Sequence, residues 1–325
     1  MRKVLAIAER EFADNIRSRR LLVVTAIFFF YFTAIYFLVL RSLSENLLVS
    51  LITSLVGSVQ FVASILGLIM GYDVIAGDRE RGILKLVLAR LVYREDVING
   101  KALGAIASIA LVLFSAFYLM LGVAISLTGV AVTLQDLARA MVSLVFITLY
   151  AIAYYSIAQF FSVLSNKASR SLVLSLAIWF LFTIILPIVA VFVSFALLGP
   201  MPVGAETEAT KEYFRKMTEI RSMITSITPE FHINSIIGAL NSVYEAELYT
   251  SLASTSTEGP GNQTEVISEI ISGMKIYPNM LDALAASWVN IVALIVYVAV
   301  FYIASYMAFV ARKIEKPFYS QILLK

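Results

Sequence analysis

The chain has 325 residues, of which 60% are hydrophobic and only 14% are charged, and it contains one histidine and no cysteine. Soluble globular proteins are about 45–50% apolar and about 25% charged, so this composition indicates a membrane protein. The absence of cysteine excludes disulfides and thiolate zinc sites, and a single histidine leaves too few ligands for an ordinary transition-metal site. The net charge of +3 is too small to indicate a nucleic-acid partner.

The N-terminal residues 1–20 predict a cytoplasmic amphipathic helix. Leu5, Ala8, Phe12 and Ile16 recur at three- and four-residue spacing, while most charged residues lie elsewhere around the helix. We expect this helix to lie at the inner membrane surface as an elbow before the first span. The alternative is a basic flank that only sets the orientation of the chain.

Six stretches are long and apolar enough to cross a membrane, since a hydrocarbon core of about 30 Å needs roughly 20 apolar residues in a helix. Their uninterrupted apolar runs do not alternate as the strands of a membrane β-barrel do. We therefore predict an all-α polytopic membrane protein with six transmembrane helices. The predicted spans are 21–40, 47–71, 102–127, 137–164 and 171–198, which fall in a segment 21–199, and a sixth within 287–311.

The distribution of basic residues predicts the orientation. Eighteen of the 25 Lys and Arg residues fall at the two termini and in the second and fourth loops, on one side of the predicted membrane. By the positive-inside rule, both termini, the loop 72–100 and the tail 312–325 are cytoplasmic. We expect a multi-pass protein of the cell membrane, in contact with the lipid bilayer.

The long fifth loop, residues 200–286, is predicted to be an extracellular helical domain in water, because it is acidic and polar. Thr228 and Pro229 are typical of an N-cap and the first position of a helix. Asn262 begins a glycosylation sequon, which is usable only outside the cell. For His232, beside Glu230, an ordinary packed or surface histidine is favoured over a pH-sensitive or metal-contacting pair.

The spans carry no ionisable residue in their middles, which argues against an ion-coupled transporter or a channel. No nucleotide-binding P-loop is present either, so transport would need energy from another polypeptide. The amides Gln60, Gln159 and Asn290, which lie inside the predicted spans, are candidates for a substrate pathway. Amides that hydrogen-bond neighbouring helices are the more ordinary interpretation.

Small residues and a proline predict local features of the bundle. Gly67 and Gly71, and also Gly100 and Gly104, lie one turn apart and allow close helix approach, which we assign to packing within the chain rather than to a dimer contact. Pro187 predicts a bend or weakened hydrogen bonding in the fifth span.

The segment 71–104, GYDVIAGDRERGILKLVLARLVYREDVINGKALG, resembles the cytoplasmic loop of ABC-2 type transporter permeases. Residues 78–82 match that loop's acidic and basic run closed by glycine, residues 84–88 its short apolar turn, and Gly100 and Lys101 its return to the third span. The upstream sequence EFADNIRSRR resembles the N-terminal elbow of the same family. The resemblance covers about the first 130 residues by motif and the remainder by topology.

The resemblance implies a coupling helix that docks onto a separate ATPase subunit. A short helix with both charge signs and an apolar side suits a groove on another protein, whereas an interfacial helix with solvated charges is the alternative. The implied docking residues are Asp78, Arg79, Glu80, Arg81, Gly82, Leu84, Leu86, Leu88, Arg90 and Arg94.

The function that the resemblance implies is that of a membrane permease in an ATP-driven exporter. No catalytic residue and no cofactor are expected in this chain, because the partner ATPase subunit would bind ATP and Mg²⁺. A second permease, identical in a homodimer or related in a heterodimer, would complete the pathway. The alternatives are a membrane anchor or signalling component that uses an ATPase without moving a substrate, and a secondary transporter or channel.

Overall fold

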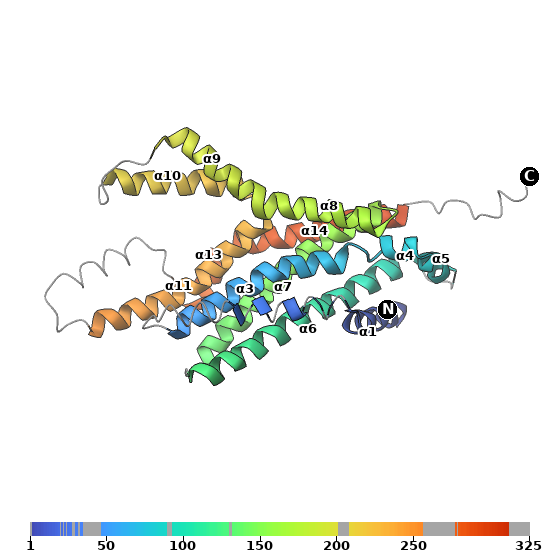
Figure 1. Cartoon of the computed structure of the whole chain (residues 1–325), viewed down its shortest axis with the longest axis horizontal. Helices are drawn as coiled ribbons and strands as arrows, with labels where there is room; N and C mark the ends of the chain where they lie inside the picture. Colours follow the sequence, from blue (N-terminus) through green and yellow to red (C-terminus); the bar gives the residue numbers. More distant parts are fainter. Residues whose placement is uncertain are drawn as a thin grey trace, which may run out of the picture.

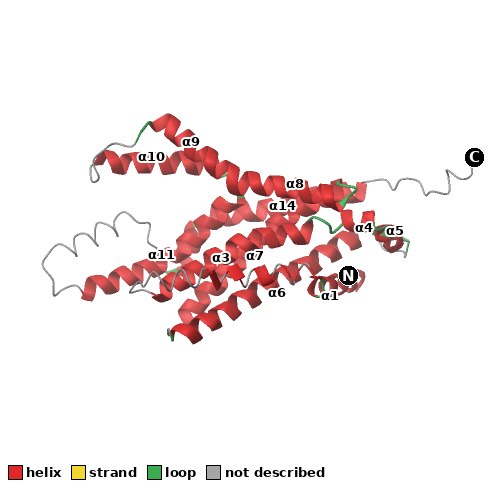
Figure 2. Ribbon diagram, viewed as in Figure 1, coloured by secondary structure: helices red, strands yellow, loops and turns green. Residues whose placement is uncertain are grey.

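The computed structural model is helical in all of its regular secondary structure (Figures 1 and 2). It describes residues 2–19, 21, 23, 25–27, 30, 31, 33, 34, 47–89, 93–129, 132–200, 208–255, 277 and 279–311. Five helices in these ranges are long and apolar enough to cross a membrane, and they correspond to the second to sixth predicted spans. The first predicted span, 21–40, lies largely outside the described residues, so the sixth crossing stays a prediction.

The N-terminal helix is α1 (Arg2–Ile16), and the spans are α3 (Leu47–Gly71), α6 (Arg94–Thr128), α7 (Leu134–Leu164), the continuous helix α8 (Ala168–Phe180), η1 (Leu181–Ile185) and α9 (Leu186–Leu198), and α14 (Trp288–Ala311). Two short helices, α4 (Ala76–Glu80) and α5 (Ile83–Leu88), join α3 to α6. The long loop contains α10 (Glu208–Thr225), α11 (Pro229–Thr255) and α13 (Met280–Ala286).

Helix α7 is the centre of the bundle and packs against both α3 and α14. It begins at a capping box, in which the Thr133 side chain accepts from the Asp136 N–H at 3.2 Å and the Asp136 carboxylate accepts from the Thr133 N–H at 2.9 Å. Tyr150, Tyr154 and Tyr155 of this helix are almost completely buried. The core of the bundle therefore surrounds α7.

Close approach of backbones explains the paired glycines. A Cβ on Gly67 would lie 2.1 Å from the carbonyl oxygen of Ala151 in α7, so only glycine fits there. At Gly104, a Cβ would lie 2.7 Å from the carbonyl oxygen of Ala8 in α1. The prediction that these glycines serve packing within the chain is confirmed.

The long loop returns to the bundle instead of standing wholly in water. α10 packs along α9 and runs back towards α8, and α11 then packs against α7 and α14 (Figure 1). Thr228 caps α11 as predicted, since its hydroxyl accepts from the Phe231 N–H at 3.2 Å. Ile233 and Ile236 are fully buried in the main core. The expectation of a water-exposed loop is therefore wrong for the first half of α11, and Asn262 lies outside the described residues.

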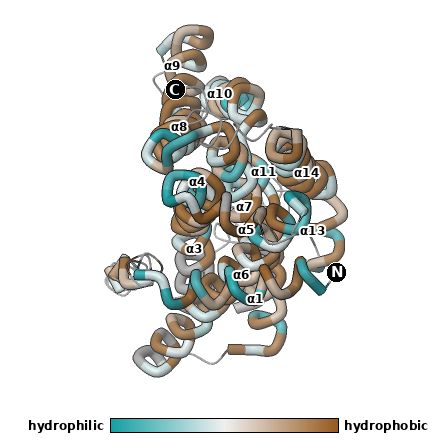
Figure 3. Tube along the Cα trace, turned by 90° about the vertical axis from the view of Figure 1, so that its right-hand side faces the viewer, coloured by the Kyte–Doolittle hydropathy of each residue, from teal (hydrophilic) through white to brown (hydrophobic). Residues whose placement is uncertain are grey.

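The outer helices of the bundle expose apolar surface. In their most apolar windows, α8–α9 and α14 are each only 11% buried, whereas α7 is 67% buried. Figure 3 shows many hydrophobic residues on α8, α9 and α14, and hydrophilic ones near α4. In water such exposed surface would be unfavourable, so lipid or another apolar partner must cover these helices.

Candidate functional site

The loop 72–100 lies at one end of the bundle, beside α1, the last turn of α7 and the end of α14; we call this the α4 end (Figure 1). Gly82 separates α4 from α5 with φ of 75°, a left-handed conformation that favours glycine. This turn changes the direction of the chain between the two short helices. Gly82 therefore bends the loop between α4 and α5.

A buried lysine joins three elements at the α4 end. Nζ of Lys101 in α6 lies 2.8 Å from Oε2 of Glu11 in α1 and 2.9 Å from Oδ2 of Asp78 in α4. Arg81 adds a second cation, with Nη2 at 3.2 Å from Oδ1 of Asp78. We call these four residues the Lys101 network. It fixes α1 and α4 to α6, and it occupies the carboxylate of Asp78 within the chain.

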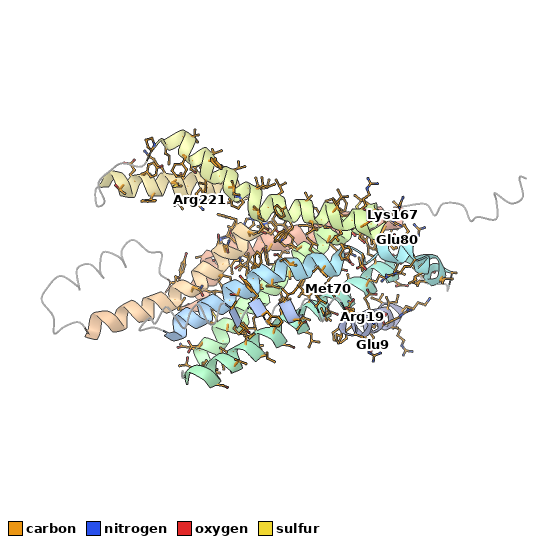
Figure 4. All side chains as sticks on the ribbon, viewed as in Figure 1. Glu9, Arg19, Met70, Glu80, Lys167 and Arg221 are labelled. Carbon is orange, nitrogen blue, oxygen red and sulfur yellow. The ribbon has the colours of Figure 1, made fainter. Side chains whose placement is uncertain are left out.

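Two other residues of the predicted docking run bind the α7–α8 connection. Arg79 donates from Nη1 to the carbonyl oxygen of Val163 at 3.1 Å and to that of Ser165. Oε2 of Glu80 accepts from the N–H of Ala168 at 3.0 Å, in the first turn of α8, and Figure 4 shows Glu80 beside Lys167 at this helix end. These bonds satisfy groups that helix ends leave unpaired. Arg79 and Glu80 thus connect α4 to two spans.

The start of α6 is attached in a similar way to α14. Arg94 donates from Nη1 to the carbonyl oxygen of Phe309 at 3.2 Å, in the last turn of α14. Seven residues before Phe309, about two turns earlier in α14, the Tyr302 hydroxyl donates to Oδ1 of Asn99 at 2.6 Å. The loop 72–100 is therefore bonded to the ends of α7, α8 and α14.

The remaining predicted docking residues divide by exposure. Leu84 is buried in a small core with Val97 and Phe309, so it holds α5 against the bundle. The side chain of Arg81 is 53% exposed and Leu86 is 69% exposed. The side chain of Leu88 and all of Arg90 lie outside the described residues. Glu80 is also exposed but bonds the start of α8. We therefore call Arg81 and Leu86 the α4–α5 surface.

A cavity of about 440 Å³ opens between α1, α4, α5 and α6. The Lys101 network forms part of its wall, and Arg10, Asp14, Arg19 and Asp73 supply further charge. Both signs of charge are thus available to a partner that enters it. Glu11 and Lys101 were not identified from sequence as members of this site, although an acid in the elbow and a lysine at the start of a span were visible signals.

The sequence as a whole matches a known family. Residues 5–314 match the family model described as ABC-2 family transporter protein. The chain belongs to the ABC-2 transporter family. It is also 29% identical over 195 residues to the probable ABC transporter permease protein NosY of Stutzerimonas stutzeri, an alignment that covers 58% of this chain and 70% of that protein. ABC permeases work with a separate subunit that hydrolyses ATP.

The three pathway candidates of this permease lie in different surroundings. Gln60 of α3 donates to Oδ1 of Asn234 at 2.6 Å, and Asn290 of α14 bonds through Oδ1 to Nδ1 of His232 at 2.9 Å. Both amides thus contact α11. Gln159 is fully buried in α7, and its amide has no hydrogen-bond partner within the described part of the chain. His232 is a packed histidine, as the sequence favoured.

Proposed function

We propose that this chain is the six-span permease subunit of an ATP-driven exporter and that the α4–α5 surface docks onto its ATPase subunit. The supporting observation is that one loop presents an exposed cation and an exposed leucine while its other side chains bond the ends of α7, α8 and α14. A displacement of this loop by a partner would move three spans together. Transport by alternating access needs such coupled motion.

The proposal divides the docking role between two groups of residues. Arg81 and Leu86 contact the ATPase directly: the leucine contributes apolar burial and the arginine sets the register. Asp78, Arg79, Glu80 and Leu84 maintain the shape of the loop, while Leu88, Arg90 and Arg94 extend the contact along the cytoplasmic face. Gly82 sets the angle between the two short helices.

The complete transporter is proposed to contain two permeases, either identical or related, and two ATPase subunits that bind ATP and Mg²⁺. Both termini and the α4 end lie in the cytoplasm, in agreement with the distribution of basic residues. The exposed apolar surfaces of α8–α9 and α14 face lipid or the second permease.

The test is a quantitative pull-down of the ATPase subunit by the full chain in detergent. Leu86→Ala combined with Arg81→Gln is expected to weaken binding at least about tenfold, because a leucine buried at an interface contributes about 1.5–3 kcal/mol. ATP hydrolysis stimulated by the permease should fall in parallel.

The matched control carries the same two changes at the far end of the molecule. Leu134 is more exposed than Leu86, and Arg215 is an exposed arginine of α10. Leu134→Ala with Arg215→Gln should bind the ATPase as the parent does. Equal binding by both double variants would show that the α4–α5 surface is not the docking site, and recovery of no ATPase by the intact parent would favour the anchor hypothesis.

A further inference from the structure

The long loop brings one acidic side chain into the middle of the bundle. Glu230 is the second residue of α11, and its carboxylate contacts Tyr150 and Tyr154 near the middle of α7 and Thr183 at the middle of the α8–α9 helix. Both helices span the predicted membrane. The sequence predicted no acid inside the bundle, because Glu230 belongs to the long loop between the fifth and sixth predicted spans.

Three hydroxyl groups converge on one oxygen of this carboxylate. Oε1 of Glu230 accepts from the Tyr150 hydroxyl at 3.2 Å and also from the hydroxyls of Tyr154 and Thr183. Oε2 is buried and has no partner in the described ranges. A buried carboxylate depends strongly on such donors, because away from water nothing else solvates its charge.

The backbone around Thr183 departs from a regular α-helix. Residues 181–185 form a π-helical turn, closed by a hydrogen bond from the Leu186 N–H to the Leu181 carbonyl. Pro187 follows and has no N–H to donate to the carbonyl of Thr183. Single π-helical turns in α-helices frequently occur at functional sites. The turn predicted to bend or loosen at Pro187 is therefore also the turn that contacts Glu230.

Other polar bonds attach the same end of α11 to α14 and α3. The Tyr297 hydroxyl of α14 donates to the carbonyl of Ile227, and His232 and Asn234 bond the amides of α14 and α3. Beyond these contacts, α11 is held by the buried apolar residue Ile236 and its neighbours. Glu230 contacts both α7 and the π-helical turn.

We propose that Glu230 is the positioning residue that holds the first half of α11 inside the bundle, and that release of α11 opens the pathway on the side opposite to the ATPase. The second half of this inference rests on the proposed exporter function. The first half concerns only the packing of α11, so the two are measured separately.

Cysteine labelling tests the packing, because the natural chain contains no cysteine. Ile236→Cys places a single thiol at a fully buried position of α11, and Met223→Cys places one at an exposed position of α10. The full-length variants are reconstituted in liposomes and treated with a membrane-impermeant maleimide. The Met223 site should react rapidly in every background and so calibrates the reagent.

Removing the contacts of Glu230 should expose the Ile236 site. In the Ile236→Cys background, Glu230→Ala is expected to raise the labelling rate roughly tenfold or more, which is the effect of losing hydrogen bonds to a charged group. Glu230→Gln keeps an acceptor oxygen and should give a smaller increase. Glu219→Ala, at an exposed acid of α10, should leave the rate unchanged.

If Glu230→Ala fails to fold, two less disruptive variants test the same contact. Tyr154→Phe removes one hydroxyl that bonds Glu230, whereas Tyr155→Phe removes the neighbouring buried hydroxyl, which has no hydrogen-bond partner in the described residues. Only Tyr154→Phe should raise labelling. Equal labelling of these two variants and the parent would overturn the assignment of Glu230.

Nucleotide dependence tests the second half of the inference. In liposomes that also contain the ATPase subunit, ATP hydrolysis should raise labelling at the Ile236 site of the otherwise unchanged chain. In Glu230→Ala the rate should already be high without ATP. A complex that hydrolyses ATP without any change in labelling would show that α11 does not move during turnover, whatever its packing at rest.

Discussion

Replacement of Lys101 by methionine is the most direct test of how the α4 end is held together. The Lys101 side chain is 11% exposed, and its partners Glu11 and Asp78 are 20% and 12% exposed. Methionine keeps the unbranched stem of lysine, with sulfur in place of Cδ, and lacks the ammonium group. Two carboxylates would then remain largely buried with one fewer cation between them.

The size of the effect follows from this geometry. Removing one partner of a buried ion pair costs about 3–5 kcal/mol. Arg81 remains 3.2 Å from Asp78 and compensates part of the charge, so we expect about 3 kcal/mol. Because every 1.4 kcal/mol is a factor of ten, the equilibrium for local detachment of α1 from α6 should increase about 100-fold.

Hydrogen exchange of the α1 amides in detergent measures this detachment. Lys101→Met should accelerate their exchange about 100-fold, whereas Lys216→Met should not, because its ion pair with Glu212 is about half exposed and is screened by solvent. Adding Glu11→Gln and Asp78→Asn to Lys101→Met removes the uncompensated charges and should restore much of the protection. If Lys101→Met changes the exchange of α1 less than threefold, the Lys101 network does not hold this helix.

Two further changes probe close packing and helix capping. Gly67→Ala should lower the stability of the fold by about 3 kcal/mol or more, because its Cβ would meet the Ala151 carbonyl. Gly57→Ala has open space around its Cβ and should be neutral or slightly stabilising. Thermal unfolding in detergent compares the two variants. Glu80→Ala removes an acceptor at the N-terminus of α8 and should lower local stability there by about 1 kcal/mol. Hydrogen exchange of the first α8 amides should then increase roughly fivefold, and the amides in the middle of α8 serve as an internal control. Unchanged exchange at Ala168 would contradict this capping role.

Much of the fold could be predicted because length and periodicity are direct consequences of helix geometry. Five of the spans, the N-terminal helix and the Thr228 cap follow from apolar run length, three- and four-residue spacing and residue type. The paired glycines were also informative. A Cβ at Gly67 or Gly104 would collide with a neighbouring backbone. Glycines spaced one turn apart therefore indicate that another helix packs closely there.

The partners of the charged loop could not be predicted in the same way. Arg79 and Glu80 bind backbone groups of Val163, Ser165 and Ala168, and a backbone carbonyl or N–H has no sequence signature. A run of alternating charges is equally compatible with solvent, a partner protein or helix ends in the same chain. The sequence therefore identified the loop as important but not which of its residues face outwards.

The position of α11 was misjudged for a related reason. Ile233, Ile236 and Leu240 recur at three- and four-residue spacing, which indicates one apolar side of a helix. The surrounding loop is acidic, and overall polarity outweighed this local pattern in the prediction. An apolar side of a helix predicts that the side is buried, but only the structure shows that the bundle buries it.

The unequal burial of the spans has a consequence for how this sequence can change over time. Lipid chains are as apolar as leucine, so exchanges among Leu, Val, Ile and Phe on the exposed sides of α9 and α14 alter little. On α7, where tyrosines and glycine contacts fill the space, an exchange of similar size creates a cavity or a clash. Substitutions should therefore accumulate rapidly on the outer helices and slowly on α7. Distant relatives should retain hydropathy on α9 and α14, and residue volume on α7.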